Sequence, residues 1–372
     1  MKQPLIDLTA QYQTIKDRID DAISRVLKRT DFILGQDVRL FEQEFAQYIG
    51  VKHAIGVASG TDALVIALAA SGIGPGDEVI TSPFTFIATA EAIQRVGARI
   101  VFADIDRKSF TIDPKKIAGR INQKTKAIIP VHLYGEPCAM DEIHKLVSNS
   151  SISIIEDCAQ SLGAVYNSKK VGSIGRIGCF SFFPGKNLGC YGDGGIITTN
   201  DTECAERIKL MRNHGSVSKY EHVMHGYNSR LDTIQAAVLR VKLPLVDQWN
   251  EQRRAHADGY RSALEQEGFT AQFLSTRSVS SMNYFTIYVD SGRDELQAYL
   301  KEQGIASAIY YPQSLHVQKV FADLGYKHGD FPEAEYAQER VLSLPMYAEL
   351  TDDQRSYIIN EIKKFKKGKK VS

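Results

Sequence analysis

The sequence predicts an α/β protein with a mostly parallel central sheet, helices on both faces of that sheet, and a smaller C-terminal α+β unit. Between residues 53 and 155, short apolar runs rich in isoleucine and valine alternate with segments of helical periodicity. Continuous apolar runs are typical of strands buried on both faces, as in parallel sheets. With 372 residues the chain is long enough for two domains.

The alternation assigns the elements of the first domain in order. Two amphipathic helices open the chain at residues 12–27 and 38–49. A polar loop is expected at 212–222. Strands are predicted at 53–58, 78–81, 99–103, 127–131, 152–155 and 196–199, and helices at 65–70, 88–96, 114–121, 140–147 and 205–211. In such sheets ligands bind beyond the carboxyl ends of the strands.

A long helical region is predicted from residue 230 to residue 265, and the charge of its second half favours an exposed helix that bridges two domains. We therefore divide the chain into a large domain of residues 1–248 and a small domain of residues 249–372. In the small domain the pattern predicts strands at 284–289 and 307–311 and helices at 294–303 and 352–365.

Composition favours a small-molecule partner. Lysine and arginine number 45 against 44 aspartates and glutamates, so no overall charge favours nucleic acid or a membrane surface. The basic run at 363–370 is interpreted as a solvated terminus. No membrane span and no signal peptide is predicted, and we expect a soluble, cytoplasmic protein.

The five cysteines indicate neither disulfides nor a metal site. They are odd in number, form no C-x-x-C pair and have no close histidine partners, so we expect reduced thiols and no bound metal. A catalytic or redox cysteine is the minor alternative.

One lysine stands out because Lys186 lies between an aromatic run and a cluster of glycines in residues 179–195. Glycine backbones bend closely around a ligand. The arrangement points to a covalent anchor for a carbonyl cofactor, against the alternative of a surface turn with an unremarkable lysine. A pyridoxal phosphate enzyme also needs a carboxylate for the pyridine nitrogen, donors for the phosphate and a flat contact for the ring.

The carboxylate is expected at the end of the strand at 152–155, where Glu156 and Asp157 follow. Adjacent strand residues point to opposite faces, so only one of the two enters a given pocket. We choose Asp157, whose charge would keep the ring nitrogen protonated; a helix cap is the alternative. Gln160 is placed to bond the cofactor's phenolic oxygen.

The turn at residues 59–63 offers backbone N–H groups at a helix start, with Gly60 allowing close approach and Thr61 adding a hydroxyl. A plain serine-capped helix is the alternative. Ser181 is a further phosphate candidate. For the ring contact the residues leave two choices, Phe84 and Phe86, either of which is equally compatible with a core position.

These motifs closely resemble the DegT/StrS family of sugar-nucleotide aminotransferases, pyridoxal phosphate enzymes of fold type I. The resemblance spans nearly the whole chain. Its most specific segments are Ser59-Gly-Thr-Asp-Ala-Leu64, Glu156-Asp-Cys-Ala-Gln-Ser161, Ser181-Phe-Phe-Pro-Gly-Lys186, Gly192-Asp-Gly-Gly195, Arg212-Asn-His-Gly215 and Gly226-Tyr-Asn-Ser-Arg-Leu-Asp232.

The resemblance implies a role for each candidate. Lys186 would form the internal aldimine with pyridoxal 5'-phosphate and shuttle protons, Asp157 would pair with the pyridinium, and Gln160 would meet the ring oxygen. It selects Phe86 for stacking. The phosphate contacts it implies are Gly60, Thr61, Ser181 and, from a neighbouring subunit, Asn228, which makes the active unit a homodimer.

The resemblance also implies a substrate class, a nucleotide-linked keto-sugar aminated at C3 with glutamate as donor and 2-oxoglutarate as its product. The segment 310–318 looks like the Tyr-Pro-x-Pro-Leu-His segment of C3 enzymes, with Ser314 in place of the usual proline. Sugar or diphosphate contacts are expected from Arg230, Tyr311 and His316. The amino sugar would serve surface polysaccharide or related biosynthesis.

Four alternatives stay open. The first is amination of the sugar at C4 instead of C3, the second is a dehydratase, and the third is a silent or regulatory homologue. The fourth is an oxidoreductase. Dehydratase relatives carry histidine where this chain has Lys186, which disfavours the second. Oxidoreduction is weaker still because no G-x-G-x-x-G follows the first strand.

Overall fold

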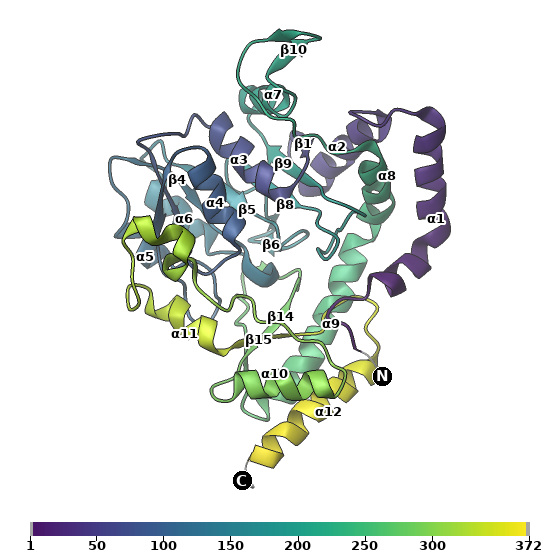
Figure 1. Ribbon diagram of the computed structural model, residues 1–372, viewed down its shortest axis with the longest axis vertical. Coiled ribbons are helices and arrows are strands. Elements are labelled where there is room, and N and C mark those ends of the chain that lie inside the picture. The colour runs from purple at the N-terminus through teal and green to yellow at the C-terminus, as the bar shows by residue number, and fades with distance from the viewer. Residues whose placement is uncertain (1–2, 370–372) are drawn as a thin grey trace.

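The computed structural model describes residues 3–369 and is built on a seven-stranded sheet (Figure 1). In order across the sheet its strands are β1 (His53–Val57), β9 (Gly195–Thr199), β8 (Ile177–Ser181), β5 (Ser153–Asp157), β4 (Thr125–Ile129), β2 (Glu78–Thr81) and β3 (Arg99–Phe102). All neighbouring pairs are parallel except those of β9, which runs antiparallel to β1 and to β8. The predicted mostly parallel sheet is confirmed.

Helices cover both faces of this sheet because successive strand residues face opposite sides. Ile155 of β5 packs in one buried cluster with α3, α4 and α7, whereas its neighbour Ile154 packs in another with α5 and α6. Near β1 and β9 the second face is covered by α2 and α8. The helices are α1 (Leu8–Arg29), α2 (Gln36–Ile49), α3 (Gly60–Ala70), α4 (Ile87–Arg95), α5 (Pro114–Ala118), α6 (Met140–Val147), α7 (Thr202–Met211) and α8 (Thr233–Lys242).

The long helix predicted at 230–265 is two helices. α8 ends at Lys242, a 3-10 turn spans Leu243–Leu245, and α9 begins at Val246 and ends at Glu265. Pro244 lies in that turn, and its ring removes the N–H that a continuous helix needs. The expected bridging fits α9, because Val246 packs in a core beside the large sheet and Tyr260 packs in the C-terminal core. The expected exposure is wrong along one face, where α9 buries a full stripe of side chains. The division at 248/249 falls in its first turn and stays a prediction.

The C-terminal part forms a second core. Its sheet has the order β12 (Thr270–Ala271), β14 (Phe285–Tyr288) and β15 (Val341–Leu344), flanked by α10 (Arg293–Glu302), α11 (Pro332–Arg340) and α12 (Asp352–Lys369). The strand predicted at 307–311 is wrong: only Ala308 pairs there, in an isolated bridge to Ser343. Lys370, the last residue of the predicted basic run, lies outside the described residues.

Several strands were not predicted from the sequence pattern. The loop expected at 212–222 is a projecting hairpin of β10 (Ser216–Ser218) and β11 (Glu221–His222) (Figure 1). Strand β8 was missed because Gly178 interrupts its apolar run. A Cβ there would lie 2.5 Å from the Cα of Gly172, so the close packing requires glycine. A small sheet combines β13 (Ser278–Val279), β6 (Val165–Tyr166) and β7 (Lys169–Lys170).

None of the helices within residues 3–369 has both the length and the apolar character that a membrane span requires. All five cysteines, which lie within these residues, are unpaired and buried.

Candidate active site

The candidate residues gather at the carboxyl edge of the sheet, where the strands β1, β8, β5 and β2 end on the same side. Asp157 is the last residue of β5 and Ser181 the last of β8. The helix start at Gly60 follows β1, and Phe86 follows β2. Parallel strands bring their carboxyl ends to one edge, so the fold unites residues that are up to 121 positions apart, from Gly60 to Ser181.

Lys186 lies in a tight loop after β8. The loop is closed by Phe182 N donating to Gly194 O (2.8 Å) and Cys190 N donating to Phe182 O (2.9 Å). A Cβ on Gly189 would lie 2.2 Å from Pro184 O, so glycine is needed there.

Burial lowers the pKa of the Lys186 amine to about 8, against an opposing attraction from Asp157. About one tenth of the amine is therefore uncharged at pH 7, far more than for an ordinary lysine, and the uncharged amine is the form that attacks a carbonyl carbon.

Asp157 is 4% exposed and holds two hydrogen bonds. Thr89 Oγ1 donates to Oδ2 at 2.8 Å, and the backbone N–H of Ala159 donates to Oδ1 at 3.1 Å. Burial raises the pKa of the Asp157 carboxyl, while the bond from Thr89 and the charge of Lys186 oppose that rise. Thr89 was not predicted from sequence.

Glu156 points to the opposite face, as the strand alternation predicts. One of its oxygens meets His132 Nε2 (3.0 Å) and Gly172 N (2.9 Å). The other accepts the N–H groups of Ile174 (2.9 Å) and Gly175 (2.6 Å). Glu156 thus fastens a loop beneath the sheet.

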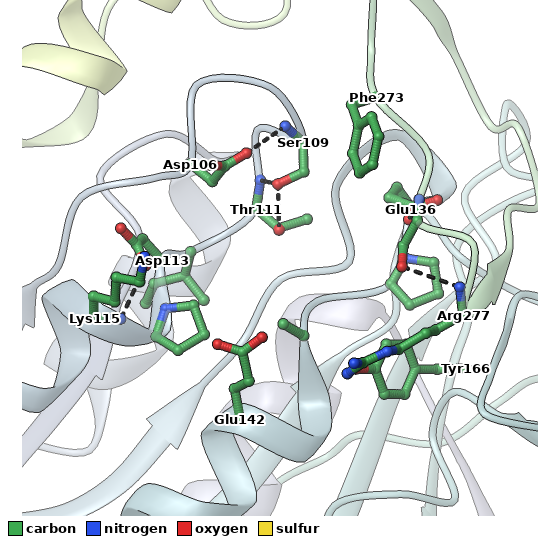
Figure 2. Close-up of a pocket in the computed structure, with 15 residues that line it drawn as sticks. Asp106, Ser109, Thr111, Asp113, Lys115, Glu136, Glu142, Tyr166, Phe273 and Arg277 are labelled. Carbon is green, nitrogen blue, oxygen red and sulfur yellow. Dashed lines mark hydrogen bonds between the residues drawn. The ribbon is translucent and has the colours of Figure 1, made fainter.

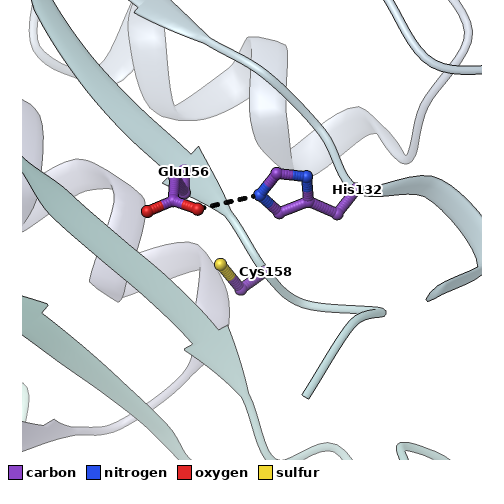
Figure 3. A group of neighbouring side chains, drawn as sticks. All are labelled: His132, Glu156 and Cys158. Atoms are coloured by element: carbon purple, nitrogen blue, oxygen red, sulfur yellow. Dashed lines mark hydrogen bonds and ion pairs between the residues drawn. The ribbon is translucent and has the colours of Figure 1, made fainter. Parts of the chain in front are cut away.

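Within the described chain, one group of side chains has the spacing of metal ligands, namely His132, Glu156 and Cys158 (Figure 3). The ring nitrogens of His132 and the carboxylate oxygens of Glu156 are already hydrogen-bonded within the protein. His132 Nδ1 accepts Cys138 N (3.0 Å), which leaves Nε2–H to donate to Glu156. Burial raises the pKa of the Cys158 thiol well above its ordinary value. This arrangement favours a structural hydrogen-bond network.

Gln160 bridges two tyrosines. Its Oε1 accepts the backbone N–H of Tyr134 at 2.8 Å, and its Nε2 donates to the hydroxyl of Tyr311 at 2.9 Å. Tyr311 comes from the segment between α10 and α11, so this bond ties the C-terminal part to the sheet edge. The backbone contact of Tyr134 was not predicted from the sequence.

The start of α3 packs directly on the end of β8. A Cβ on Gly60 would lie 2.6 Å from Ser181 Cβ, so only glycine allows this approach. Ser59 caps the helix by accepting Asp62 N at 3.1 Å. A further residue missed from sequence, Ser229, is fully buried and donates to Asp62 Oδ2 at 2.6 Å.

The structure distinguishes the two phenylalanines. Phe84 is 1% exposed and packs in the core near Phe110. Phe86 is 56% exposed, and its ring lies 6.2 Å from that of Tyr311. Only Phe86 is therefore available to a ligand in this chain.

Asn228 and Arg230 lie together in the segment before α8. Asn228 is exposed and pairs by its backbone with Asn213, whose side chain accepts a bond from Arg230 at 3.1 Å.

His316 is buried: it is 1% exposed, and its Nε2 lies 3.0 Å from Glu335 Oε1. The predicted sugar contact by His316 does not fit this geometry.

Ser314 gains a bond that the family's usual proline lacks. Its backbone N–H donates to Gln338 Oε1 at 2.6 Å. The next residue, Leu315, donates to Pro83 O at 2.8 Å, which fastens this segment beside Phe86.

A separate cavity of about 310 Å³ lies between the segment 106–115, helix α6 and the segment 273–277 (Figure 2). Glu136 lines it, accepting Ser278 Oγ (2.6 Å) and Ser275 N (2.9 Å), and burial raises the pKa of this carboxyl to about 7. None of the predicted site residues lines this cavity.

A part-buried lysine and a buried carboxylate at the carboxyl edge of a mostly parallel sheet are the features of pyridoxal phosphate aminotransferases of fold type I. The chain belongs to the DegT/DnrJ/EryC1/StrS aminotransferase family, which it matches over residues 13–363. The predicted family is confirmed.

Three relatives illustrate the match. A protein of Geobacillus stearothermophilus named pleiotropic regulatory protein is 49% identical, covering 98% of this chain and 99% of its own. The UDP-N-acetyl-3-dehydro-alpha-D-glucosamine 3-aminotransferase of Acidithiobacillus ferrooxidans is 46% identical, covering 97% of both. The crystal structure of S. venezuelae DesV in complex with a ketimine intermediate superposes with a TM-score of 0.96 at 40% identity, covering 98% of both chains.

Proposed function

We propose that this protein transfers an amino group from glutamate to C3 of a nucleotide-linked keto-sugar, using pyridoxal phosphate held by Lys186. The product is an amino sugar for surface polysaccharide or related biosynthesis. The observation that carries the proposal is the pairing of Lys186, with its pKa lowered to about 8, and the buried Asp157 at one sheet edge. Aminotransferases of this family bind pyridoxal phosphate.

The residues present fit that cofactor. The start of α3 offers backbone N–H groups and the Thr61 hydroxyl for a phosphate, and Ser181 packs against Gly60 there. Asp157 would meet the ring nitrogen, Gln160 the ring oxygen, and Phe86 the ring face. When bound, the cofactor supplies an electron sink that stabilises negative charge at the carbon bearing the transferred amine.

Lys186 supports two tasks of the reaction. Its uncharged amine would hold the cofactor covalently, and the same Nζ, when free, would accept a proton from the Cα of the amino donor. Asp157 would place its charge against the ring nitrogen and so favour the protonated ring. Tyr311 orients Gln160 through its hydroxyl.

The relatives support the sugar. The protein of A. ferrooxidans is named for amination at carbon 3 of a UDP-sugar, and C3 is the position that the segment 310–318 also favours. Arg230 and Tyr311 remain the proposed sugar or diphosphate contacts. Amination at C4 would be distinguished by the position of the amine in the product.

A homodimer is part of the proposal. Asn228 is exposed in the single chain, and apolar side chains exposed nearby include Tyr220, at 84% exposure, and Val223. Both come from the hairpin region, which projects from the body (Figure 1). Exposed apolar side chains on a projecting segment favour contact with a second subunit. Asn228 would then reach the phosphate site of that subunit.

A regulatory role is the second candidate because the relative at 49% identity is named a regulatory protein. The two functions differ in one measurable respect. An enzyme releases an amino sugar, whereas a silent regulator would bind the cofactor and convert no substrate.

The test combines one reaction with two lysine variants. Purified protein, glutamate and a UDP-linked 3-keto-sugar should yield an amino sugar and 2-oxoglutarate, detected by mass spectrometry. Lys186→Met should abolish both products. Lys209→Met is the control for loss of a lysine, because Lys209 lies on α7 and its amine donates to Glu206 Oε1 (2.7 Å), outside the loop of Lys186. Turnover by Lys186→Met would refute the proposal.

A further inference from the structure

We propose that Thr89 is the positioning residue of Asp157: its hydroxyl orients the carboxylate and holds it in the ionised form that the cofactor's ring nitrogen requires. The inference rests on the proposed function for its catalytic consequence. The contact between Thr89 and Asp157 does not depend on it.

The geometry indicates that the hydroxyl of Thr89 donates its hydrogen bond to Asp157. Thr89 lies in the first turn of α4, is 1% exposed, and its Oγ1 is 2.8 Å from Asp157 Oδ2. An ionised carboxylate only accepts hydrogen bonds, so Thr89 is the donor. Thr85 Oγ1 lies 3.2 Å from Thr89 Oγ1 and must then donate to it. The result is a buried relay from Thr85 through Thr89 to Asp157.

Two donors fix the plane of the Asp157 carboxylate. Thr89 holds Oδ2, and the backbone N–H of Ala159 holds Oδ1 at 3.1 Å. The backbone bond is set by the chain itself, whereas the bond from Thr89 depends on one side chain. Helix α4 therefore positions a group that belongs to β5, 68 residues further along the chain.

Hydrogen bonds to the charged form keep a buried carboxylate ionised. Thr89 opposes the rise in the pKa of Asp157 that burial causes, together with Ala159 N and the charges of Lys186 and His132. The other titratable groups whose pKa values respond to Asp157 are Cys138, Cys158, Cys179 and Tyr311. None of these four donates a hydrogen bond to it in the described residues.

Thr89→Val is the discriminating change because valine has nearly the shape of threonine and lacks the hydroxyl. Thr89→Ser restores the donor. Thr81→Val is the matched control: Thr81 is equally buried at the end of β2, but its hydroxyl donates to Ile129 O at 2.9 Å and not to the site.

In the cofactor-free protein, the Asp157 carboxyl followed by ¹³C NMR should titrate at higher pH in Thr89→Val than in wild type. Thr89→Ser and Thr81→Val should match wild type. With cofactor bound, the visible absorbance should titrate about one pH unit higher in Thr89→Val, because a less positive ring lets the nitrogen joined to Lys186 keep its proton. The rate constant of turnover should fall about 10- to 100-fold, as for one bond to a charged group.

Unchanged titrations in Thr89→Val, or changes that Thr81→Val reproduces, would overturn the inference. The two proposals fail separately. If wild-type protein takes up no pyridoxal phosphate, the proposed function is wrong, and the carboxyl titration of the cofactor-free protein still decides the role of Thr89.

Discussion

The two faces of the end of β5 carry adjacent carboxylates with opposite surroundings. Glu156 accepts four hydrogen bonds from its own chain, two on each oxygen, which fills its capacity. Asp157, equally buried, accepts two. A buried charge with capacity left over is costly unless a ligand completes it. The difference separates a group that holds the fold from a group prepared for a cofactor.

Asp157→Asn changes the ligand-facing side of the β5 end and should have the largest effect on turnover. The amide keeps the size of the side chain and removes the charge, so we expect the rate constant of turnover to fall about 10²–10³-fold. The free energy of unfolding of the cofactor-free protein should change little. Steady-state kinetics and urea denaturation measure the two quantities. An unfolding loss without a kinetic loss would reverse the assignment of the two faces.

Glu156→Gln should produce the opposite pattern. An amide NH₂ in place of one oxygen would face a backbone N–H that now has no acceptor. We expect the free energy of unfolding to fall by about 2–4 kcal/mol, as for breaking a buried charged network. Turnover per folded molecule should stay within a few-fold of wild type. Denaturation curves and kinetics of the two variants, Glu156→Gln and Asp157→Asn, are measured side by side. A large loss of turnover in Glu156→Gln would contradict a purely structural role for Glu156.

Much of the fold was predictable because buried parallel strands leave a plain signal in the sequence. The run at 78–81 became β2 with the predicted bounds, and Asp157 and Ser181 fell at strand ends on one edge. Strand β8 was not predictable, since Gly178 is required by contact with Gly172, a fact of tertiary packing. The segment 307–311 has a strand-like composition but pairs only at Ala308.

The candidate site was predictable where a residue's type announces its chemistry, as for Lys186 among glycines. It was not predictable where an ordinary residue acts through a distant partner. In the sequence Thr89 resembles any threonine in a helix, and its role follows only from the contact with Asp157 of β5 in the folded chain. The burial of His316 was unpredictable for the same reason: its Nε2 pairs with Glu335, 19 residues later, only once the chain is folded.

Lys186, which lies on the same side as Asp157, makes the ligand-facing side sensitive to pH. Because burial lowers the pKa of Lys186 to about 8, its uncharged fraction rises with pH up to that value. The rate at which cofactor-free protein takes up pyridoxal phosphate should therefore rise about tenfold from pH 6.5 to 7.5 and level off above about 8. Stopped-flow absorbance measures it. Lys209→Met should keep the profile, and a rise that continues to about pH 10, the ordinary value for lysine, would contradict the lowered pKa.

Cys158→Ala should have the smallest effect, and it tests whether the Glu156 side is purely structural. The thiol lies beside His132 and Glu156, whose bonds are complete without it. Removing the buried sulfur should lower the free energy of unfolding by about 1 kcal/mol and leave turnover unchanged. Added zinc should shift the melting temperature of wild type and variant equally. If zinc stabilised wild type alone, the three side chains would be a metal site, and the face assigned to holding the fold would bind a ligand of its own.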